Sequence, residues 1–211
     1  MRAFAELLDR LSLTASRNAK LVLVRDYLRA TPDPDRGWAL AALTGDLTFD
    51  AAKPAMIRKA VEGRVDSVLF GWSYDYVGDL AETVALIWPA APDWRPNREP
   101  ELSEVVEALR TASRAEVRGL LETWLDALEP KGRWALLKLM TGALRVGLSA
   151  RLAKTAAAMM RPDAAPAPPS PDGREGETAL ETLDASAIEE VWHAVEPPYA
   201  DLFAWLEGRA D

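Results

Sequence analysis

The sequence predicts an all-α fold, and three observations support this prediction. Ala, Leu, Arg and Glu dominate the chain, apolar residues recur three and four positions apart, and Asn-Gly-type hairpin turns between alternating strands are missing. The length of 211 residues, with 49% hydrophobic residues and eight Trp, suffices for a substantial core. We expect a single multi-helix domain of roughly ten to twelve helices over residues 1–211.

The apolar periodicity places the expected helices in chain order at residues 2–12, 17–30, 36–44, 54–64, 76–88, 101–111, 114–128, 131–143, 150–160, 185–195 and 198–207. Several begin with capping signals. Ser113 with Glu116, and Ser186 with Glu189, have the spacing of a capping box. We expect Thr14 or Ser16 to cap the second helix, and Asp79 and Ser149 to cap the helices that follow them.

Two proline-rich segments interrupt the helical pattern. Residues 162–178 form an expected flexible Pro/Ala-rich loop, because prolines remove amide donors and Ala, Ser and Gly offer little to bury. Pro89–Pro100 is a second irregular connection, in which Trp94 is expected to contact the core. Neither segment necessarily divides domains.

Composition excludes several classes of site. The chain has no Cys, so disulfides and thiolate zinc sites are excluded, and the single histidine, His193, cannot form an imidazole cluster. We assign His193 no role. No apolar run approaches the ~18 residues of a membrane span, and we expect a cytosolic protein with no membrane partner.

Positive charge is concentrated in residues 130–162, here called the basic island. It contains seven Lys and Arg residues and no Asp or Glu, whereas the whole chain carries −8, so the remainder carries −15. Its cations are Lys131, Arg133, Lys138, Arg145, Arg151, Lys154 and Arg161. Such a segment in an acidic chain suggests a polyanionic partner that binds one face only.

The spacing within the island suggests a phosphate-binding surface. If residues 131–144 are helical, Lys131, Lys138 and Arg145 form one stripe about 21 Å long. In the next helix, Arg151, Lys154 and Arg161 share a face. Gly142 and Gly147 would let the backbone approach a ligand closely, and Ser149 would begin a helix whose free amides attract an anion.

Simpler interpretations stand beside this one. In the first, the cations of the island only balance acidic helices elsewhere, solvated or paired at the surface. In the second, Arg17 and Lys20, which form a second basic cluster, are solvated and bind nothing. Trp134 is expected in the core rather than as a stacking platform, because it lies among Ala135, Leu136 and Leu137. The carboxylates Asp75, Asp79 and Glu82 lack a defined substrate pocket, and capping is the favoured role of Asp79.

Three strings, TASRNAK, YVGDLAE and GRWALLKLMTGALRVGLSARLAK, resemble the N-terminal DNA-binding domain of ATP-dependent DNA ligases, especially bacterial ones. The resemblance spans most of the chain. It implies an all-helical domain that grips nicked duplex DNA through the minor groove, while other domains carry out adenylyl transfer and sealing. The implied partners are nicked double-stranded DNA and the catalytic domains of the same ligase, in the cytoplasm and associated with the nucleoid.

The chain departs from the family pattern in its lack of a nucleophile. The family uses the lysine of a K-x-D-G motif, but no lysine here is followed by x-Asp-Gly, and the nearest string, SPDG, has Ser170 in the lysine position. We therefore expect no catalytic residue, no metal site and no cofactor in this chain, with ATP and Mg²⁺ required only by the parent ligase. The nucleotidyltransferase and OB domains are absent from it.

The resemblance implies DNA contacts for Arg145, Gly147 and Ser149, with Arg151 and Lys154 beside them and Arg17 and Lys20 as further candidates. The full set of expected DNA-binding residues comprises Arg17, Lys20, Lys131, Arg133, Lys138, Gly142, Arg145, Gly147, Ser149, Arg151 and Lys154. A different function also remains open. A helical protein-interaction scaffold would use the basic island to dock an acidic partner, and the net charge of −8 favours it. A standalone enzyme is the least favoured class.

Overall fold

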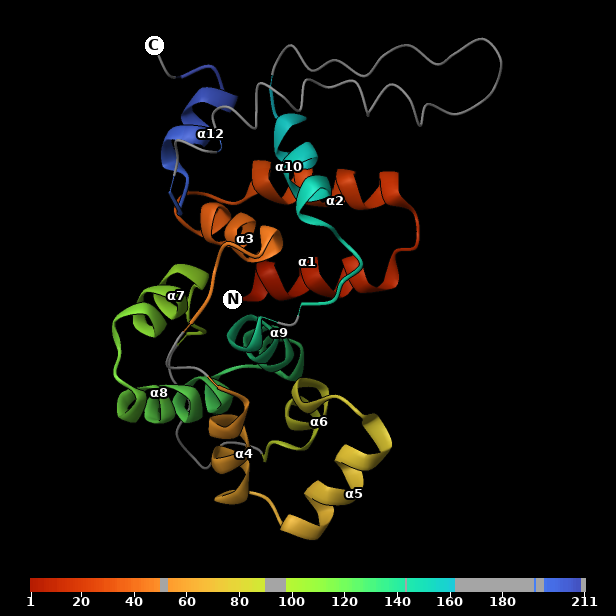
Figure 1. The fold of residues 1–211 in the computed structure, drawn as a ribbon, viewed down its shortest axis with the longest axis vertical. Coiled ribbons are helices and arrows are strands. Elements are labelled where there is room, and N and C mark those ends of the chain that lie inside the picture. Colours follow the sequence, from red (N-terminus) through yellow and green to blue (C-terminus); the bar gives the residue numbers. More distant parts are fainter. Residues whose placement is uncertain (50–52, 90–97, 143, 162–191, 193–195, 210–211) are drawn as a thin grey trace. The chain divides into compact units, whose positions relative to one another are not determined.

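The computed structural model describes residues 1–49, 53–89, 98–142, 144–161, 192 and 196–209 (Figure 1). Within these ranges the chain forms eleven α-helices and no strand, which confirms the expected all-α class. The helices are α1 (Arg2–Leu13), α2 (Arg17–Ala30), α3 (Asp35–Thr44), α4 (Pro54–Glu62), α5 (Ser67–Val77), α6 (Leu80–Ile87), α7 (Leu102–Thr111), α8 (Arg114–Ala127), α9 (Pro130–Thr141), α10 (Ala150–Ala158) and α12 (Ala200–Leu206). None of these helices is long and apolar enough to cross a bilayer.

The clearest departure from the expected elements lies at residues 67–88. One helix was expected at 76–88, but two are present, and α5 was not expected at all. The reason is local: Gly78 has a left-handed backbone with φ 74° that ends α5, and the Asp79 carboxylate accepts a hydrogen bond of 3.0 Å from Glu82 N to start α6. The helix expected at 185–195, the Ser186–Glu189 pair, Trp94 and the loop at 162–178 lie outside the described residues.

The other capping predictions are confirmed. Ser16 caps α2 by accepting from Ala19 N, and Ser149 caps α10 by accepting from Leu152 N. Ser113 and Glu116 form the expected reciprocal box at the start of α8. Caps of this kind fix where each helix begins, and hence which side chains stand at its exposed end.

The helices assemble into two compact units, and each unit combines segments that are far apart in the sequence. Unit 1 comprises Met1–Leu13 and Leu47–Val146, and unit 2 comprises Thr14–Asp46 and Gly147–Asp211.

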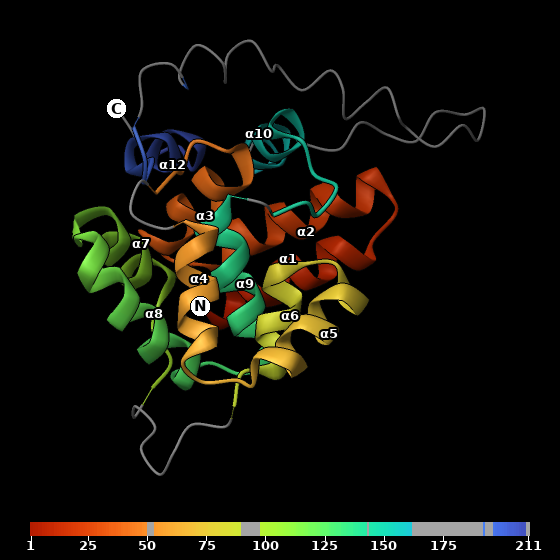
Figure 2. The ribbon, with the colours of Figure 1, turned by 60° about the horizontal axis from the view of Figure 1, so that its bottom comes forward.

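Unit 1 is organised around α9, which packs against α1 and against α6 (Figure 1, Figure 2). Eight of its twelve residues are buried, including Leu136, Leu137 and Met140. A helix that is apolar on nearly all sides is the interior element of its unit. Around it, α5 packs against α6, and α4 packs against α8.

Unit 2 is organised around α10, which packs against α2 and α3 (Figure 1). Ala153, Ala156 and Ala157 are fully buried there, and their small side chains allow neighbouring helices to approach closely. The Arg36 guanidinium of α3 lies 4.2 Å from the centre of the Phe203 ring and pairs with Asp33 and Glu207, which ties α12 to α3. The Tyr199 hydroxyl donates to Asp46 at 2.9 Å.

A pair of glycine substitutions tests the packing of unit 2. A Cβ atom added at Gly37 in α3 would lie 1.6 Å from the Pro198 carbonyl oxygen. Because this neighbour is backbone, we expect Gly37→Ala to lower the free energy of unfolding by about 1–3 kcal/mol in urea titrations. In α8 of unit 1, a Cβ atom at Gly119 meets nothing within 4 Å, so Gly119→Ala should raise it by about 0.5–1 kcal/mol. Equal stability of the two variants would contradict this packing.

Candidate nucleic-acid interface

The segment that follows α9 changes direction at three residues with left-handed backbone. Gly142, Arg145 and Gly147 have φ values of 66°, 46° and 64°. A positive φ at a residue other than glycine is uncommon, and at Arg145 it shows that the chain is no longer helical. The expected stripe of Lys131, Lys138 and Arg145 along one helix is therefore not formed, because α9 ends at Thr141.

The start of α10 is exposed and begins with Ser149. The Ser149 hydroxyl accepts from Leu152 N at 3.2 Å, and Ser149, Ala150 and Arg151 are all exposed. The positive end of the helix dipole and its first amides form an environment that favours an anion. No carboxylate in the described part of the chain pairs with the exposed Arg145 or Arg151 side chains.

Lys20 of α2 holds the turn at Gly147. Its ammonium is largely buried and donates a hydrogen bond of 2.9 Å to the Gly147 carbonyl oxygen. A Cβ atom at Gly147 would lie only 2.5 Å from the Lys20 Nζ atom. The backbone conformation thus favours glycine at 147, and any other side chain there would also have to displace the end of the Lys20 side chain. Arg17, one turn before Lys20, is exposed at the start of α2.

Two further cations of the basic island, both in unit 2, lie over aromatic rings. The Lys154 ammonium is 4.6 Å from the centre of the Trp192 ring, and the Arg161 guanidinium is 4.9 Å from that of Trp205. Cation–π contacts of this kind fix the direction of a long side chain without neutralising its charge. Lys154 is half-buried and Arg151 is exposed, so the two expected neighbours differ in access to a ligand.

In unit 1, two cations of the island are internal. Arg133 is buried, with its Nε atom 2.7 Å from the Leu125 carbonyl oxygen and a second nitrogen 3.3 Å from that of Trp88. The Lys138 ammonium is buried and lies 2.6 Å from an Asp79 carboxylate oxygen. The exposed row of cations expected along this helix is therefore absent, because Arg133 and Lys138 serve the interior of the unit.

Lys131 is at the surface of unit 1 and forms ion pairs with α1. Its ammonium lies 3.0 Å from Glu6 and 2.7 Å from Asp9. The hydrogen bonds that the Lys131 ammonium donates to Asp9 and Glu6 raise the pKa of Lys131 above its usual range. Both acids belong to α1, more than a hundred residues earlier in the sequence. This pairing agrees with the simpler interpretation, in which cations of the basic island balance acidic helices elsewhere.

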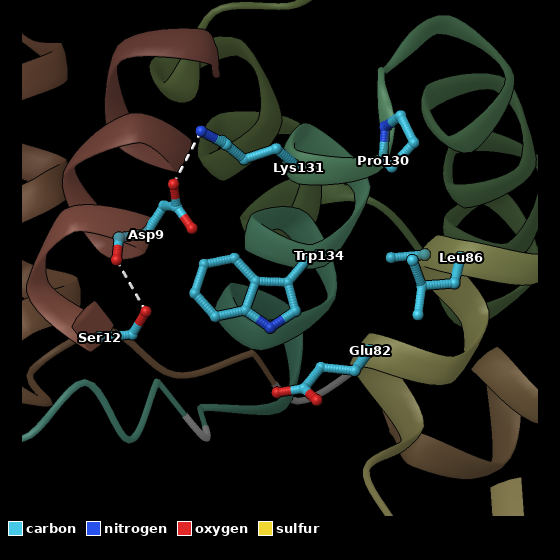
Figure 3. A pocket seen from close by; sticks show the side chains of 8 residues that line it. Asp9, Ser12, Glu82, Leu86, Pro130, Lys131 and Trp134 are labelled. Carbon is cyan, nitrogen blue, oxygen red and sulfur yellow. Dashed lines mark hydrogen bonds and ion pairs between the residues drawn. The ribbon is translucent and has the colours of Figure 1, made fainter. Parts of the chain in front are cut away.

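Trp134 lines a shallow hollow of about 300 Å³ in unit 1 (Figure 3). The lining residues are Asp9, Ser12, Glu82, Ala85, Leu86, Pro130, Lys131 and Trp134. Trp134 is half-buried, not enclosed as a core residue, because the face of α9 that bears it lies beside the carboxylates of α1 and α6. Elsewhere in the described ranges, no three His, Asp or Glu side chains gather in a way that would hold a metal ion.

Most of the chain matches a known protein family. Residues 1–158 match the family described as DNA ligase N terminus. The chain belongs to this family. No curated protein matches the chain. The family assignment confirms the resemblance seen in the sequence and supports a DNA-binding role associated with a DNA ligase.

The matched region of this DNA ligase N-terminal chain includes every residue for which DNA contact was expected. Arg17, Lys20, Gly147, Ser149, Arg151 and Lys154 belong to unit 2, and Lys131, Arg133, Lys138, Gly142 and Arg145 belong to unit 1. Within unit 2, α2 and α10 pack together and bring Lys20 to Gly147. Contact of any of these residues with DNA stays a prediction.

The sequence did not indicate the partners that fix these cations. Asp79 was expected only as a cap, yet it both caps α6 and neutralises Lys138. The positive charge of Lys131 and Lys138 in the basic island is neutralised by carboxylates elsewhere in the chain. Counting charges along the sequence does not show which carboxylates these are.

A substitution of Asp79 tests the buried pair. Partial burial of the Asp79 carboxylate opposes its ionisation, but hydrogen bonds from Lys138 and from backbone amides outweigh this and lower its pKa. A lowered folded-state pKa contributes stability above the unfolded pKa of ~3.9, which is lost as pH falls through the lowered value. We expect Asp79→Asn to lower the free energy of unfolding at pH 7 by about 1–3 kcal/mol, and the deficit to shrink in acid.

Asp75→Asn is the control for that measurement, because Asp75 is an exposed carboxylate of α5. Urea titrations at several pH values give both differences. A deficit for Asp79→Asn that is constant with pH would contradict the ion pair.

A second pair of variants tests the tie between Lys20 and the turn. Gly142→Ala and Gly147→Ala both place a side chain at positive φ, at a cost of about 1 kcal/mol each. Only Gly147→Ala also displaces the Lys20 ammonium, since nothing lies within 4 Å of a Cβ atom at Gly142. We expect Gly147→Ala to be clearly less stable than Gly142→Ala on urea unfolding. Similar losses would mean that Lys20 does not restrain the turn.

Proposed function

We propose that this chain binds nicked duplex DNA without sequence preference, as the N-terminal clamp of an ATP-dependent DNA ligase acting in DNA repair or replication. The observation that carries the proposal is the turn from Arg145 to Arg151. In this segment Arg145 is exposed at the end of unit 1, and Arg151 of unit 2 is exposed in the capped first turn of α10, after the turn at Gly147. The family assignment of residues 1–158 supports a DNA ligand for it.

The chemistry of the turn suits phosphate and sugar better than base edges. A nick occurs in any sequence, so a protein that recognises it needs contacts to the backbone and to groove shape. Two arginines, helix amides at Ser149–Arg151 and a close backbone approach at Gly147 supply contacts of this kind. In the minor groove the pattern of donors and acceptors on the base edges is degenerate, so contacts there give little sequence preference.

The structure suggests different roles within the proposed contact set. Arg145, Gly147, Ser149 and Arg151 contact the DNA backbone, Arg17 and Lys154 extend the surface, and Lys20 positions the Gly147 turn. Arg133 and Lys138 are left out of the proposed set because burial and internal partners occupy both groups. Adenylyl transfer and sealing are assigned to the catalytic domains of the ligase, in the cytoplasm on the nucleoid.

Salt titration tests the proposal. Binding to labelled nicked and intact duplexes is measured by fluorescence anisotropy over a range of salt concentrations. If about five phosphates are neutralised, the log–log slope should be near −4 to −5. Arg145→Glu and Arg151→Glu should each weaken binding and flatten the slope by about one unit.

Lys59→Glu is the charge-matched control, because Lys59 is an exposed cation of α4 outside the proposed set. It should leave the slope unchanged. Binding that is absent, independent of salt, or weakened equally by all three variants would contradict the clamp. Such a result would favour the scaffold that docks an acidic protein on the island.

A further inference from the structure

Helix α5 is apolar on its solvent side. It has the sequence SVLFGWSYDYV, and none of its eleven residues is buried. Four large apolar side chains are exposed, with Val68 at 54%, Leu69 at 51%, Trp72 at 73% and Tyr76 at 93% of their free surface. These four residues are here called the α5 patch. The outer face of an ordinary surface helix is polar, so the patch requires an explanation.

The patch is one continuous face. Val68, Trp72 and Tyr76 are four residues apart, and Leu69 is three before Trp72, so all four project from the same side of the helix. The opposite side carries Phe70 and Tyr74, whose rings stack at 6.1 Å. The Arg58 guanidinium of α4 lies 4.6 Å from the centre of the Tyr74 ring. Helix α5 lies beside α6 (Figure 2), and its face with Val68, Trp72 and Tyr76 is exposed.

The charge around the patch is negative. Residues 65–88 contain four carboxylates, Asp66, Asp75, Asp79 and Glu82, and no Lys or Arg. Asp79 is paired with Lys138, and the Asp66 carboxylate caps α5 by accepting from Val68 N and Leu69 N. Asp75 lies between Trp72 and Tyr76 in the sequence, and Glu82 is exposed on α6, whereas the Arg58 guanidinium lies on the opposite side of α5, over Tyr74. This arrangement disfavours DNA phosphates and anionic lipid headgroups. It also disfavours a second copy of the chain, which would bring like charges together.

We propose that the α5 patch docks a basic polypeptide segment of a partner protein. Apolar side chains of that segment cover Trp72 and Tyr76, and its Lys or Arg residues meet Asp66 and Asp75. Aromatic anchors with a charged rim are typical of the residues that dominate protein interfaces. Proteins also commonly recognise one another through apolar side chains spaced three and four residues apart on one face of a helix. The proposal concerns a surface separate from the Arg145–Arg151 turn.

The probe is a fluorescently labelled synthetic peptide of Leu and Lys arranged as an amphipathic helix, titrated with the 211-residue chain at about 0.15 M salt. We expect saturable binding to the unaltered protein. The double variant Trp72→Ala/Tyr76→Ala should weaken it about tenfold or more. Asp75→Lys should weaken it through charge alone. Leu13→Ala is the control, because Leu13 is an exposed apolar residue outside the patch.

Both patch side chains are exposed, so the double variant should keep its fold, which circular dichroism and urea unfolding verify. Absence of peptide binding, equal binding by the double variant, or equal binding of a peptide with Glu in place of Lys would each overturn the proposal. Sedimentation tests the other occupants: a dimer that Trp72→Ala/Tyr76→Ala abolishes would assign the patch to a second copy. Loss of nicked-DNA binding by the same variant would assign it to DNA.

Discussion

The structure depends most on the burial of α9 together with two of its cations. A buried charge is costly unless it is paired and hydrogen-bonded, and each cation meets this requirement at the ends of other helices. Arg133 reaches carbonyl oxygens at the end of α8 and just after α6, where the helix dipole is negative. Lys138 reaches Asp79 at the start of α6. The two side chains therefore fix both ends of α6 against α9.

The seven cations of the basic island have at least three physical roles. Arg133 and Lys138 hold unit 1 together, Lys131 pairs with carboxylates of α1, and Lys154 and Arg161 lie over Trp192 and Trp205 in unit 2. Arg145 and Arg151 are exposed beside a constrained turn. A run of like charge in a sequence can thus combine structural ion pairs with a short segment whose cations are exposed.

Local signals predicted most of the fold. Ser16, Ser113 and Ser149 mark helix starts correctly because capping depends only on residues within one turn. Helix α5 was missed because its residues are apolar on both faces, so the expected contrast of an amphipathic helix is weak. In the candidate site, Gly147 and Ser149 follow from local backbone chemistry. The contact of Lys20 with Gly147 and the ion pair of Asp79 with Lys138 could not be predicted from local sequence, because each joins residues far apart in the chain.

The interleaving of the two units constrains how the chain acquires its structure during synthesis. Helix α1 belongs to unit 1, but its main neighbour α9 begins at Pro130, and the intervening chain includes α2 and α3 of the other unit. The apolar face of α1 therefore stays uncovered while more than a hundred further residues are made. Pairing between elements so far apart in the sequence slows folding, because the intervening chain must be ordered before the contact forms.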